Sequence, residues 1–378
     1  MENIVQANTA FAIDLYRKLA DQGANVFFSP YSIMNCLAMA HAGAKSKTEK
    51  ELAKVLHLSS KGPLLHQSFN DLYSRLKEIQ SKKSIILKMA NALWVQSEYK
   101  FKQDFAKLCR DSYLSGLFRV NYEKDPERCR LKINKWIAKQ TENKIRDILH
   151  PGFIDDLTRL IITNAIYFRG NWLKQFATFD TKDDIFWQTP EKKLEIKMMF
   201  QEDDFGYKET AELQVLEMPY VGKDLSMIII LPREQEGLSQ LEEQLSVETL
   251  REWIDNLRVG EVKVFLPRFK FTSRYSLKSV LSSLGMEEAF TNRADFSGMA
   301  DEMKHWISEI VHQSFIKVYE EGTEAAAATF VGLALGISIG EIPEFRADHP
   351  FFFIIRETSS GCIIFMGRVW EPRDQNIP

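Results

Sequence analysis

The spacing of apolar residues in the first part of the chain predicts helices. Three segments either carry apolar side chains at helical intervals or are apolar almost throughout: residues 9–21, 32–44 and 130–143. In the first segment Phe11, Leu15 and Leu19 recur every four positions, so they share one face of a helix. The second segment begins just after a Ser-Pro pair and has few polar positions, which indicates a buried helix.

Other segments have the composition of strands. Six runs are rich in β-branched, aliphatic or aromatic residues: 85–95, 160–168, 225–231, 261–267, 351–356 and 361–368. Pro232, Pro267 and Pro350 lie at the ends of three of them. Helical patterns concentrate in the first half of the chain and strand patterns in the second. The sequence therefore predicts an α+β protein rather than a regular βαβ alternation.

One segment, residues 318–331, has an unusual composition for a helix, a strand or a surface loop. Four consecutive alanines follow Gly-Thr-Glu, and the segment carries no charge after Glu324. At a spacing of two residues, one face has only small or β-branched uncharged side chains: Thr323, Ala325, Ala327, Thr329 and Val331. This pattern suits an exposed loop or a strand that slides into a sheet. An alanine-rich helix or linker is the alternative, because alanine has the highest helix propensity.

The next stretch, residues 330–340, mixes glycine with bulky aliphatic residues and carries no charge. Exposed apolar surface of this kind marks an interaction site. Residues 336–340 also match G-x-S-x-G, with Ser338 in the position of a hydrolase nucleophile. Such an enzyme needs a helix after the serine, but Pro343 opposes one and too little chain follows for the rest of the fold. The sequence therefore argues against a hydrolase.

Composition restricts the class of protein. The chain has 378 residues, of which 45% are hydrophobic and 26 are phenylalanine, so it can bury a large core. No Pro/Gly/Ser-rich linker or internal repeat divides it, and we predict a single domain over residues 1–378. A formal net charge of -3 argues against a nucleic-acid or membrane surface. No spacing of Cys and His residues suggests a metal site, and no cofactor is expected.

The cysteines and the N-terminus bear on location. Cys36, Cys109, Cys129 and Cys362 lack C-x-x-C spacing, which predicts free thiols in a reducing compartment. The first residues lack the basic and apolar regions of a signal peptide, and no apolar run is long enough to cross a membrane. We predict a cytoplasmic protein. Secretion, with a signal removed or replaced, is the alternative.

Several motifs resemble the serpins, the serine protease inhibitors that trap their target by loop insertion. Residues 320–329, Glu-Glu-Gly-Thr-Glu-Ala-Ala-Ala-Ala-Thr, are similar to the hinge of the serpin reactive loop. Residues 25–32, Asn-Val-Phe-Phe-Ser-Pro-Tyr-Ser, and 164–172, Asn-Ala-Ile-Tyr-Phe-Arg-Gly-Asn-Trp, resemble two earlier family blocks. Further blocks follow in the family's order at 295–299, 311–314, 345–351 and 365–368. The similarity covers nearly the whole chain and resembles the intracellular, ovalbumin-like branch.

This resemblance implies a serpin fold with three β-sheets, about nine helices and an exposed reactive-centre loop near residues 321–345. It implies an inhibitor rather than an enzyme. A target protease cuts the loop, forms a covalent acyl-enzyme and is carried along while the loop inserts into the main sheet, as strand addition and release of stored strain allow. Insertion of about fifteen residues at roughly 1 kcal/mol per backbone hydrogen bond supplies on the order of 10 kcal/mol. The active form is expected to be a monomer.

The resemblance also implies roles for individual residues. The hinge consists of Glu320, Gly322, Thr323, Glu324, Ala325, Ala326, Ala327, Ala328 and Thr329, and sheet opening is supported by Ser29, Ser32, Asn164, His312, Trp172 and Arg268. Arg268 is expected to pair with Glu320 at the base of the loop. Thr323 should be the first inward side chain to enter the sheet, and Glu324 should face outward. On this interpretation Thr323→Arg slows insertion and leaves native stability nearly unchanged.

The position of the scissile bond follows from loop length. Counting seventeen residues from Glu320 reaches Gly336, but glycine fills no specificity pocket. Leu335, which we favour over Gly336, suits a chymotrypsin-type pocket, and Ile337 or Ala334 suits an elastase-type pocket. No Lys or Arg lies between residues 331 and 345 for a trypsin-like protease. Two alternatives stay open: inhibition of a papain-like cysteine protease, and a non-inhibitory carrier, chaperone or storage serpin. Such non-inhibitory members usually have bulky or charged hinge residues, which this hinge lacks.

A local group of basic residues comprises Arg75, Lys77, Lys82, Lys83 and Lys88. Some serpins bind sulfated polysaccharide near such a helix. Here Glu78 interrupts the group, and a solvated helix face is the favoured interpretation.

Overall fold

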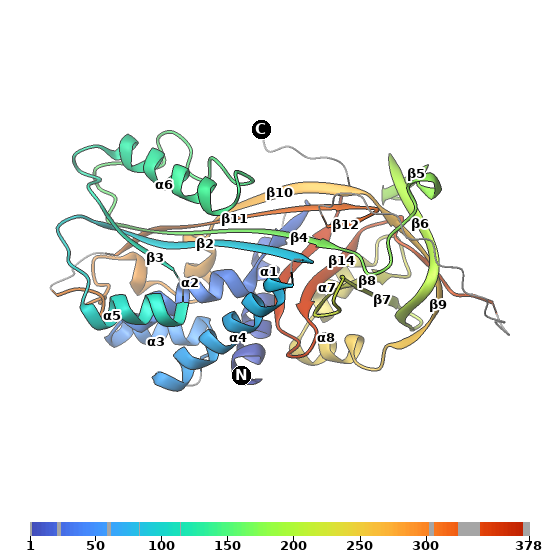
Figure 1. Ribbon diagram of the computed structural model, residues 1–378, viewed down its shortest axis with the longest axis horizontal. Coiled ribbons are helices and arrows are strands. Elements are labelled where there is room, and N and C mark those ends of the chain that lie inside the picture. The colour runs from blue at the N-terminus through green and yellow to red at the C-terminus, as the bar shows by residue number, and fades with distance from the viewer. Residues whose placement is uncertain are drawn as a thin grey trace.

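Figure 1 shows the computed structural model, in which a long sheet crosses the molecule with helices on both of its faces. The structure describes residues 2–20, 24–58, 62–82, 84–113, 115–301, 306–323 and 341–372. Within these ranges it has nine α-helices: α1 (Glu2–Leu19), α2 (Pro30–Gly43), α3 (Ser46–Val55), α4 (Pro63–Ser81), α5 (Gln103–Leu108), α6 (Pro126–Gln140), α7 (Leu238–Gln244), α8 (Val247–Ile254) and α9 (Lys278–Ser283).

The strands of the described residues form two hydrogen-bonded sheets. The six-stranded sheet has the order β10 (Phe269–Ser276), β11 (Ile307–Tyr319), β12 (Gly322–Thr323), β4 (Leu160–Asn171), β2 (Ile85–Gln96) and β3 (Gly116–Val120). The nine-stranded sheet has the order β1 (Val26–Phe28), β15 (Ile363–Val369), β14 (Phe351–Glu357), β8 (Leu225–Pro232), β7 (Leu213–Pro219), β6 (Lys192–Glu209), β9 (Arg258–Pro267) and β13 (Glu344–Arg346), with β5 (Lys182–Thr189) paired to β6.

The predicted α+β class is confirmed, and each segment assigned from apolar spacing or composition forms the expected helix or strand. The three expected sheets appear as two by hydrogen bonding because β6 joins parts that would otherwise be separate. The first part of β6 pairs with β5, its later part pairs with β9, and its end also pairs with β7.

The six-stranded sheet is buried on both faces along its central strand β4. Side chains alternate along β4, so Ile161 and Ala165 pack in the small core that contains Ile133 of α6, whereas Ile162 packs in the core that contains α2. Ile166 and residues farther along that inner face pack against the nine-stranded sheet. In Figure 1 helix α6 lies on one face of the sheet, and α1 to α5 lie on the other. Burial on both faces explains why β4 is an almost continuous apolar run in the sequence.

Two further expectations can be compared with the structure. Cys36, Cys109, Cys129 and Cys362 are all buried free thiols, as predicted. None of the described helices is long and apolar enough to cross a membrane.

Candidate sheet-opening site

The parallel pairing of β4 with β11, here called the seam, runs through the middle of the six-stranded sheet. It extends as far as Phe315 opposite Tyr167. Beyond this pair β12 lies between the two strands and is antiparallel to both, with Thr323 opposite Val318 on one side and Gly170 on the other (Figure 1). The first residues of the hinge therefore already occupy the sheet.

This placement corrects the expected limits of the exposed loop, residues 321–345. Gly322 and Thr323 belong to β12, and Glu344 begins β13, which pairs with β9. The other hinge residues, Glu324, Ala325, Ala326, Ala327, Ala328 and Thr329, and the scissile candidates Leu335, Gly336 and Ile337 lie outside the described residues.

The position of Thr323 contradicts the expectation that it enters the sheet only on insertion. Thr323 is 0% exposed, and its hydroxyl oxygen lies 2.9 Å from the hydroxyl oxygen of Tyr220. Gly322 has a φ of +146°, which side-chain-bearing residues rarely adopt, and a Cβ there would lie 2.2 Å from the carbonyl oxygen of Gly170. The entry to the seam thus fits these two residues closely, and a large side chain at Thr323 would disturb the native state.

Trp172 and Tyr220 pack together at this entry. Their rings stack with centroids 4.6 Å apart and an interplanar angle of 15°. The Trp172 indole N–H donates to the carbonyl oxygen of Tyr319 at 3.1 Å, and its backbone N–H donates to the carbonyl oxygen of Glu321 at 2.9 Å. Sequence reasoning placed Trp172 here but missed Tyr220, because Tyr220 follows β7 of the other sheet and reaches the hinge only through the tertiary fold.

Arg268 and Glu320 form the ion pair that the sequence analysis expected. The Arg268 Nε–H donates to Glu320 Oε1 at 2.7 Å, and the guanidinium also donates to the same oxygen through a terminal N–H. The hydroxyl of Thr181, which the sequence analysis did not identify, donates to that oxygen as well. The Glu320 side chain is only 3% exposed. Burial opposes ionisation of Glu320, but the hydrogen bonds from Arg268 and Thr181 outweigh it and lower the Glu320 pKa.

A row of polar side chains crosses the seam farther along. Asn91 of β2, Asn164 of β4 and His312 of β11 occupy matched positions on three strands. The Asn164 amide donates to Asn91 Oδ1 and to Ser32 Oγ, both at 2.6 Å, and the Ser32 hydroxyl donates to Asn91 Oδ1 at 3.1 Å. All these groups are buried, and each takes part in at least one hydrogen bond within the protein. Asn91 is a member of this row that the sequence analysis missed.

His312 links the two strands of the seam. Its Nε2 accepts the backbone N–H of Ser29 at 3.2 Å, so its Nδ1 carries the proton and donates to Asn164 Oδ1. Ser29 also donates its hydroxyl to the carbonyl oxygen of Ile364 at 2.6 Å. Burial lowers the pKa of His312 to about 3, so the ring is neutral at pH 7. The cross-seam bond from His312 to Asn164 must break if β4 and β11 separate.

The basic group on and after α4 is partly neutralised by nearby carboxylates. Arg75 lies 2.9 Å from a Glu357 oxygen, and Lys82 lies 2.8 Å from an Asp224 oxygen. Lys88 pairs with a glutamate after α6 at 3.2 Å. These pairs agree with a helix face engaged by the protein itself. Lys83 lies outside the described residues.

Comparison with known proteins places the chain in a family. A family model described as Serpin (serine protease inhibitor) matches residues 6–372, and the chain belongs to this family of inhibitors.

Leukocyte elastase inhibitor of Sus scrofa is 40% identical over 98% of this chain and 100% of that protein. Serpin B8 of Homo sapiens is 41% identical over the same shares. The crystal structure of uncleaved ovalbumin superposes with a TM-score of 0.88 at 30% identity, covering 98% of this chain and 100% of that one. The family is one of protease inhibitors and not of enzymes, as the sequence analysis predicted.

The buried His312 predicts a loss of native stability in mild acid. An unfolded chain takes up a proton on this side chain near pH 6.5, whereas the folded protein resists it until about pH 3. The contribution is complete above pH 6.5 and falls by about 1.4 kcal/mol per pH unit below it. From pH 6.5 to 5 the wild-type free energy of unfolding should therefore fall by about 2 kcal/mol more than that of His312→Gln, which keeps a donor and an acceptor. Urea unfolding followed by fluorescence measures the difference; parallel pH profiles would contradict it.

The buried Thr323 predicts that Thr323→Arg destabilises the native protein. Thr323 is fully buried and its side chain hydrogen-bonds with the Tyr220 hydroxyl, so burial of a guanidinium at this position should cost about 3 kcal/mol or more. Thr323→Val is the matched control, because it keeps the shape and loses only the contact with the Tyr220 hydroxyl, at about 1 kcal/mol. Urea unfolding of both variants tests the expectation. Wild-type stability for Thr323→Arg would mean that β12 does not occupy the sheet in solution.

Proposed function

We propose that this protein inhibits a chymotrypsin- or elastase-like serine protease by suicide-substrate trapping, with the cleaved loop inserting into the seam. The observation that carries the proposal is β12, because a strand has already started between β4 and β11 and runs antiparallel to both. Continued insertion needs only that the same strand advance along the seam. The names of the relatives, which include leukocyte elastase inhibitor, support the same class of target.

The register of β12 defines where an inserted loop would lie. Thr323 is opposite Val318 and Gly170, so the same register brings Thr329 opposite His312 and Asn164. A threonine hydroxyl both donates and accepts, and it could replace the cross-seam bond that insertion breaks. The same register brings residue 333 opposite Leu160, where β4 begins. The length of the seam thus matches the chain available before Leu335 and Gly336.

The change in pairing supplies the driving force. Insertion exchanges one parallel ladder for two antiparallel ladders, and antiparallel pairing is slightly more stable per residue. A gain of about ten backbone hydrogen bonds at roughly 1 kcal/mol each is on the order of 10 kcal/mol. That rivals the total stability of a typical domain, about 5–15 kcal/mol. It suffices to carry an attached protease and distort its active site.

The loop chemistry restricts the target. We assign cleavage after Leu335, with Gly336 as the second choice and Ile337 suited to an elastase-type pocket. Inhibition of a papain-like cysteine protease by the same trap, and a non-inhibitory role, are the competing functions. The four buried free thiols agree with action in a reducing compartment, and we propose a monomeric, single-domain inhibitor in the cytoplasm.

A protease panel distinguishes these functions. We expect chymotrypsin or elastase to form a complex with the protein that survives a denaturing gel, and trypsin to form none through cleavage between residues 331 and 342. The physical reason is the apolar loop without Lys or Arg in this range. A stable complex with papain alone would favour the cysteine-protease alternative. Cleaved protein without any complex would contradict inhibition.

A pair of alanine variants tests insertion apart from native stability. In the register of β12, Ala325 would face inward between Ile316 and Phe168, whereas Ala326 would face the opposite side of the sheet. Ala325→Arg should therefore turn the inhibitor into a substrate, with at least tenfold less covalent complex per cleavage, because a buried charge slows insertion. Ala326→Arg is the matched control and should retain most complex formation. Equal yields from the two variants, measured on denaturing gels, would rule out this register.

A further inference from the structure

A recess beside helix α6 is separate from the loop and from the entry to the seam. It has a volume of about 530 Å³ and lies between α6 and strands β2 and β3. Small-molecule sites usually have volumes of about 300–1,000 Å³. The walls of this recess combine aromatic rings with lysines, and this combination indicates the class of ligand.

Three aromatic rings form the apolar part of the recess. Trp94 of β2 is fully buried and stacks on Phe118 of β3, with centroids 4.2 Å apart and an interplanar angle of 20°. Trp136 of α6 meets both rings at steep angles, 5.6 Å from Trp94 and 5.2 Å from Phe118. The Trp94 indole N–H donates to Thr163 Oγ1 at 2.9 Å, which fixes the orientation of this ring. Phe118 and Trp136 are only partly buried, so their surfaces are available to a ligand.

Three lysines line the same recess from α6. Lys132, Lys135 and Lys139 are spaced by three and four residues, so they lie along one side of the helix. All three are exposed, and none forms an ion pair within the described part of the chain. Like charges at this spacing repel each other and weaken the helix slightly. An anion in the recess would relieve that repulsion.

The two acidic residues nearest to these lysines in the sequence are already engaged. Glu127, the acidic residue of α6, accepts hydrogen bonds from Arg130 at 2.6 and 2.8 Å. Glu142, which follows the helix, pairs with Lys88 at 3.2 Å. These two carboxylates are therefore not available to the lysines of the recess, which can attract an anion from solution.

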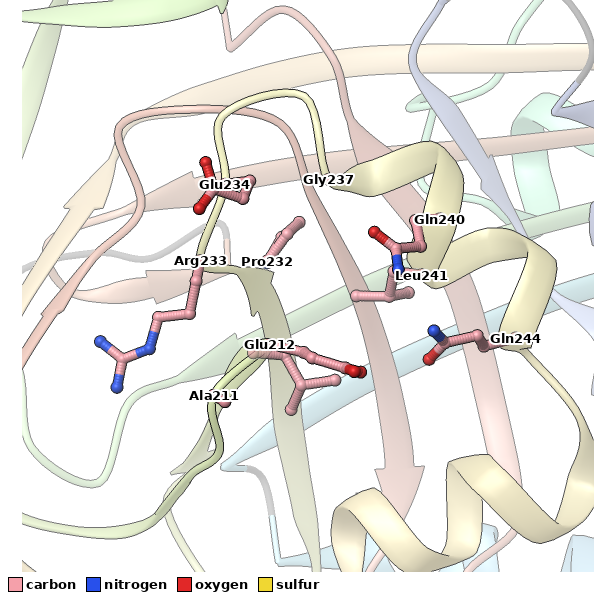
Figure 2. Close-up of a pocket in the computed structure, with 10 residues that line it drawn as sticks. Ala211, Glu212, Pro232, Arg233, Glu234, Gly237, Gln240, Leu241 and Gln244 are labelled. Carbon is pink, nitrogen blue, oxygen red and sulfur yellow. The ribbon is translucent and has the colours of Figure 1, made fainter.

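Two other recesses do not combine these features. The recess beside α7 (Figure 2) has only about 120 Å³ and includes the carboxylates of Glu212 and Glu234, which disfavour an anion. The recess between α1 and α8 has about 290 Å³, but its arginines, Arg251 and Arg356, are already paired with carboxylates. Only the recess beside α6, of these three, offers aromatic surface together with unpaired cations.

We propose that the recess beside α6 binds an amphiphilic anion, a small molecule with a flat hydrocarbon body and one carboxylate or sulfonate. The body would pack on Trp136 and Phe118, where it buries apolar surface and stacks. The anionic group would lie beside Lys132 and Lys135. Lys139 attracts it less, because it lies in the last turn of α6, where the helix carries partial negative charge.

A pair of fluorescent probes tests this proposal on the native, full-length protein. 8-Anilino-1-naphthalenesulfonate and N-phenyl-1-naphthylamine share one aromatic body, and only the first carries a sulfonate. At low salt we expect the sulfonate probe to bind roughly tenfold more tightly than the neutral probe. A few exposed charge attractions, each of ordinary strength, together give a factor of about this size. The preference should shrink as salt is added, because salt screens exposed charges. Fluorescence titration gives both affinities.

Variants with a matched charge control locate the binding. Lys132→Gln with Lys135→Gln should bring the affinity for the sulfonate down to that for the neutral probe. Lys50→Gln with Lys54→Gln removes the same charge from the exposed face of α3 and should leave the preference intact. Trp136→Leu should weaken binding of both probes. Circular dichroism establishes that each variant is folded.

Two results would overturn the proposal. One is equal affinity of the wild-type protein for the two probes, which would exclude recognition of the anion. The other is sulfonate binding that survives in the Lys132 and Lys135 double variant, or that falls equally in the α3 control. Binding that survives in the Lys132 and Lys135 double variant would place the probe elsewhere. An equal fall in the α3 control would show that the probe responds to net charge alone.

Discussion

The parallel pairing of β4 with β11 holds the centre of the six-stranded sheet together, and β12 already divides it at one end. Each residue of the seam takes part in a single ladder across it, whereas an inserted strand would provide two. On the proposed mechanism, the interactions that close the seam are the ones that insertion of the loop would replace. This one constraint connects the hinge, the entry and the polar row, because each of them acts on whether the two strands remain neighbours.

Polar contacts hold the seam at two places along its length. At the entry, the hydroxyls of Thr323 and Tyr220 meet, and Arg268 neutralises Glu320. Farther along, His312 crosses from β11 to Asn164. These groups are buried, so an unsatisfied partner would cost roughly 1–3 kcal/mol. A few polar contacts of this kind can therefore resist separation of β4 and β11. The apolar side chains along the seam resist it less, because their contacts do not depend on a specific partner.

The two faces of the six-stranded sheet are covered by different hydrophobic cores. On the inner face, the nine-stranded sheet and the helices from α1 to α5 provide the main cores. On the outer face, α6 covers a smaller core that includes Ile161, Ala165 and Val311 from the two strands of the seam. The recess at the side of α6 uses Trp94 from the neighbouring strand β2. A ligand there would therefore contact the wall of this smaller core without occupying the path of an inserting strand.

The sequence by itself determined the local elements and the composition of the hinge. An almost continuous apolar run identified β4, which is buried on both faces, and the run of small residues after Glu320 showed a segment without the bulk to anchor a core. Resemblance to the family supplied Arg268 and His312. The bounds of helix α4 were not assigned, although Leu72, Leu76 and Ile79 form part of its buried stripe, since a single amphipathic stripe among many polar residues is a weak signal.

Only the tertiary structure decided how distant segments pair. The burial of Thr323 depends on how far β4 and β11 separate, and the role of Tyr220 depends on how the second sheet packs beneath the first. Asn91 joins His312 only because strands far apart in the sequence share one register. Likewise, the lysines of α6 meet Trp94 and Phe118 only in the folded chain. Periodicity reports the environment of a side chain along its own element, whereas register and packing between elements depend on the whole core at once.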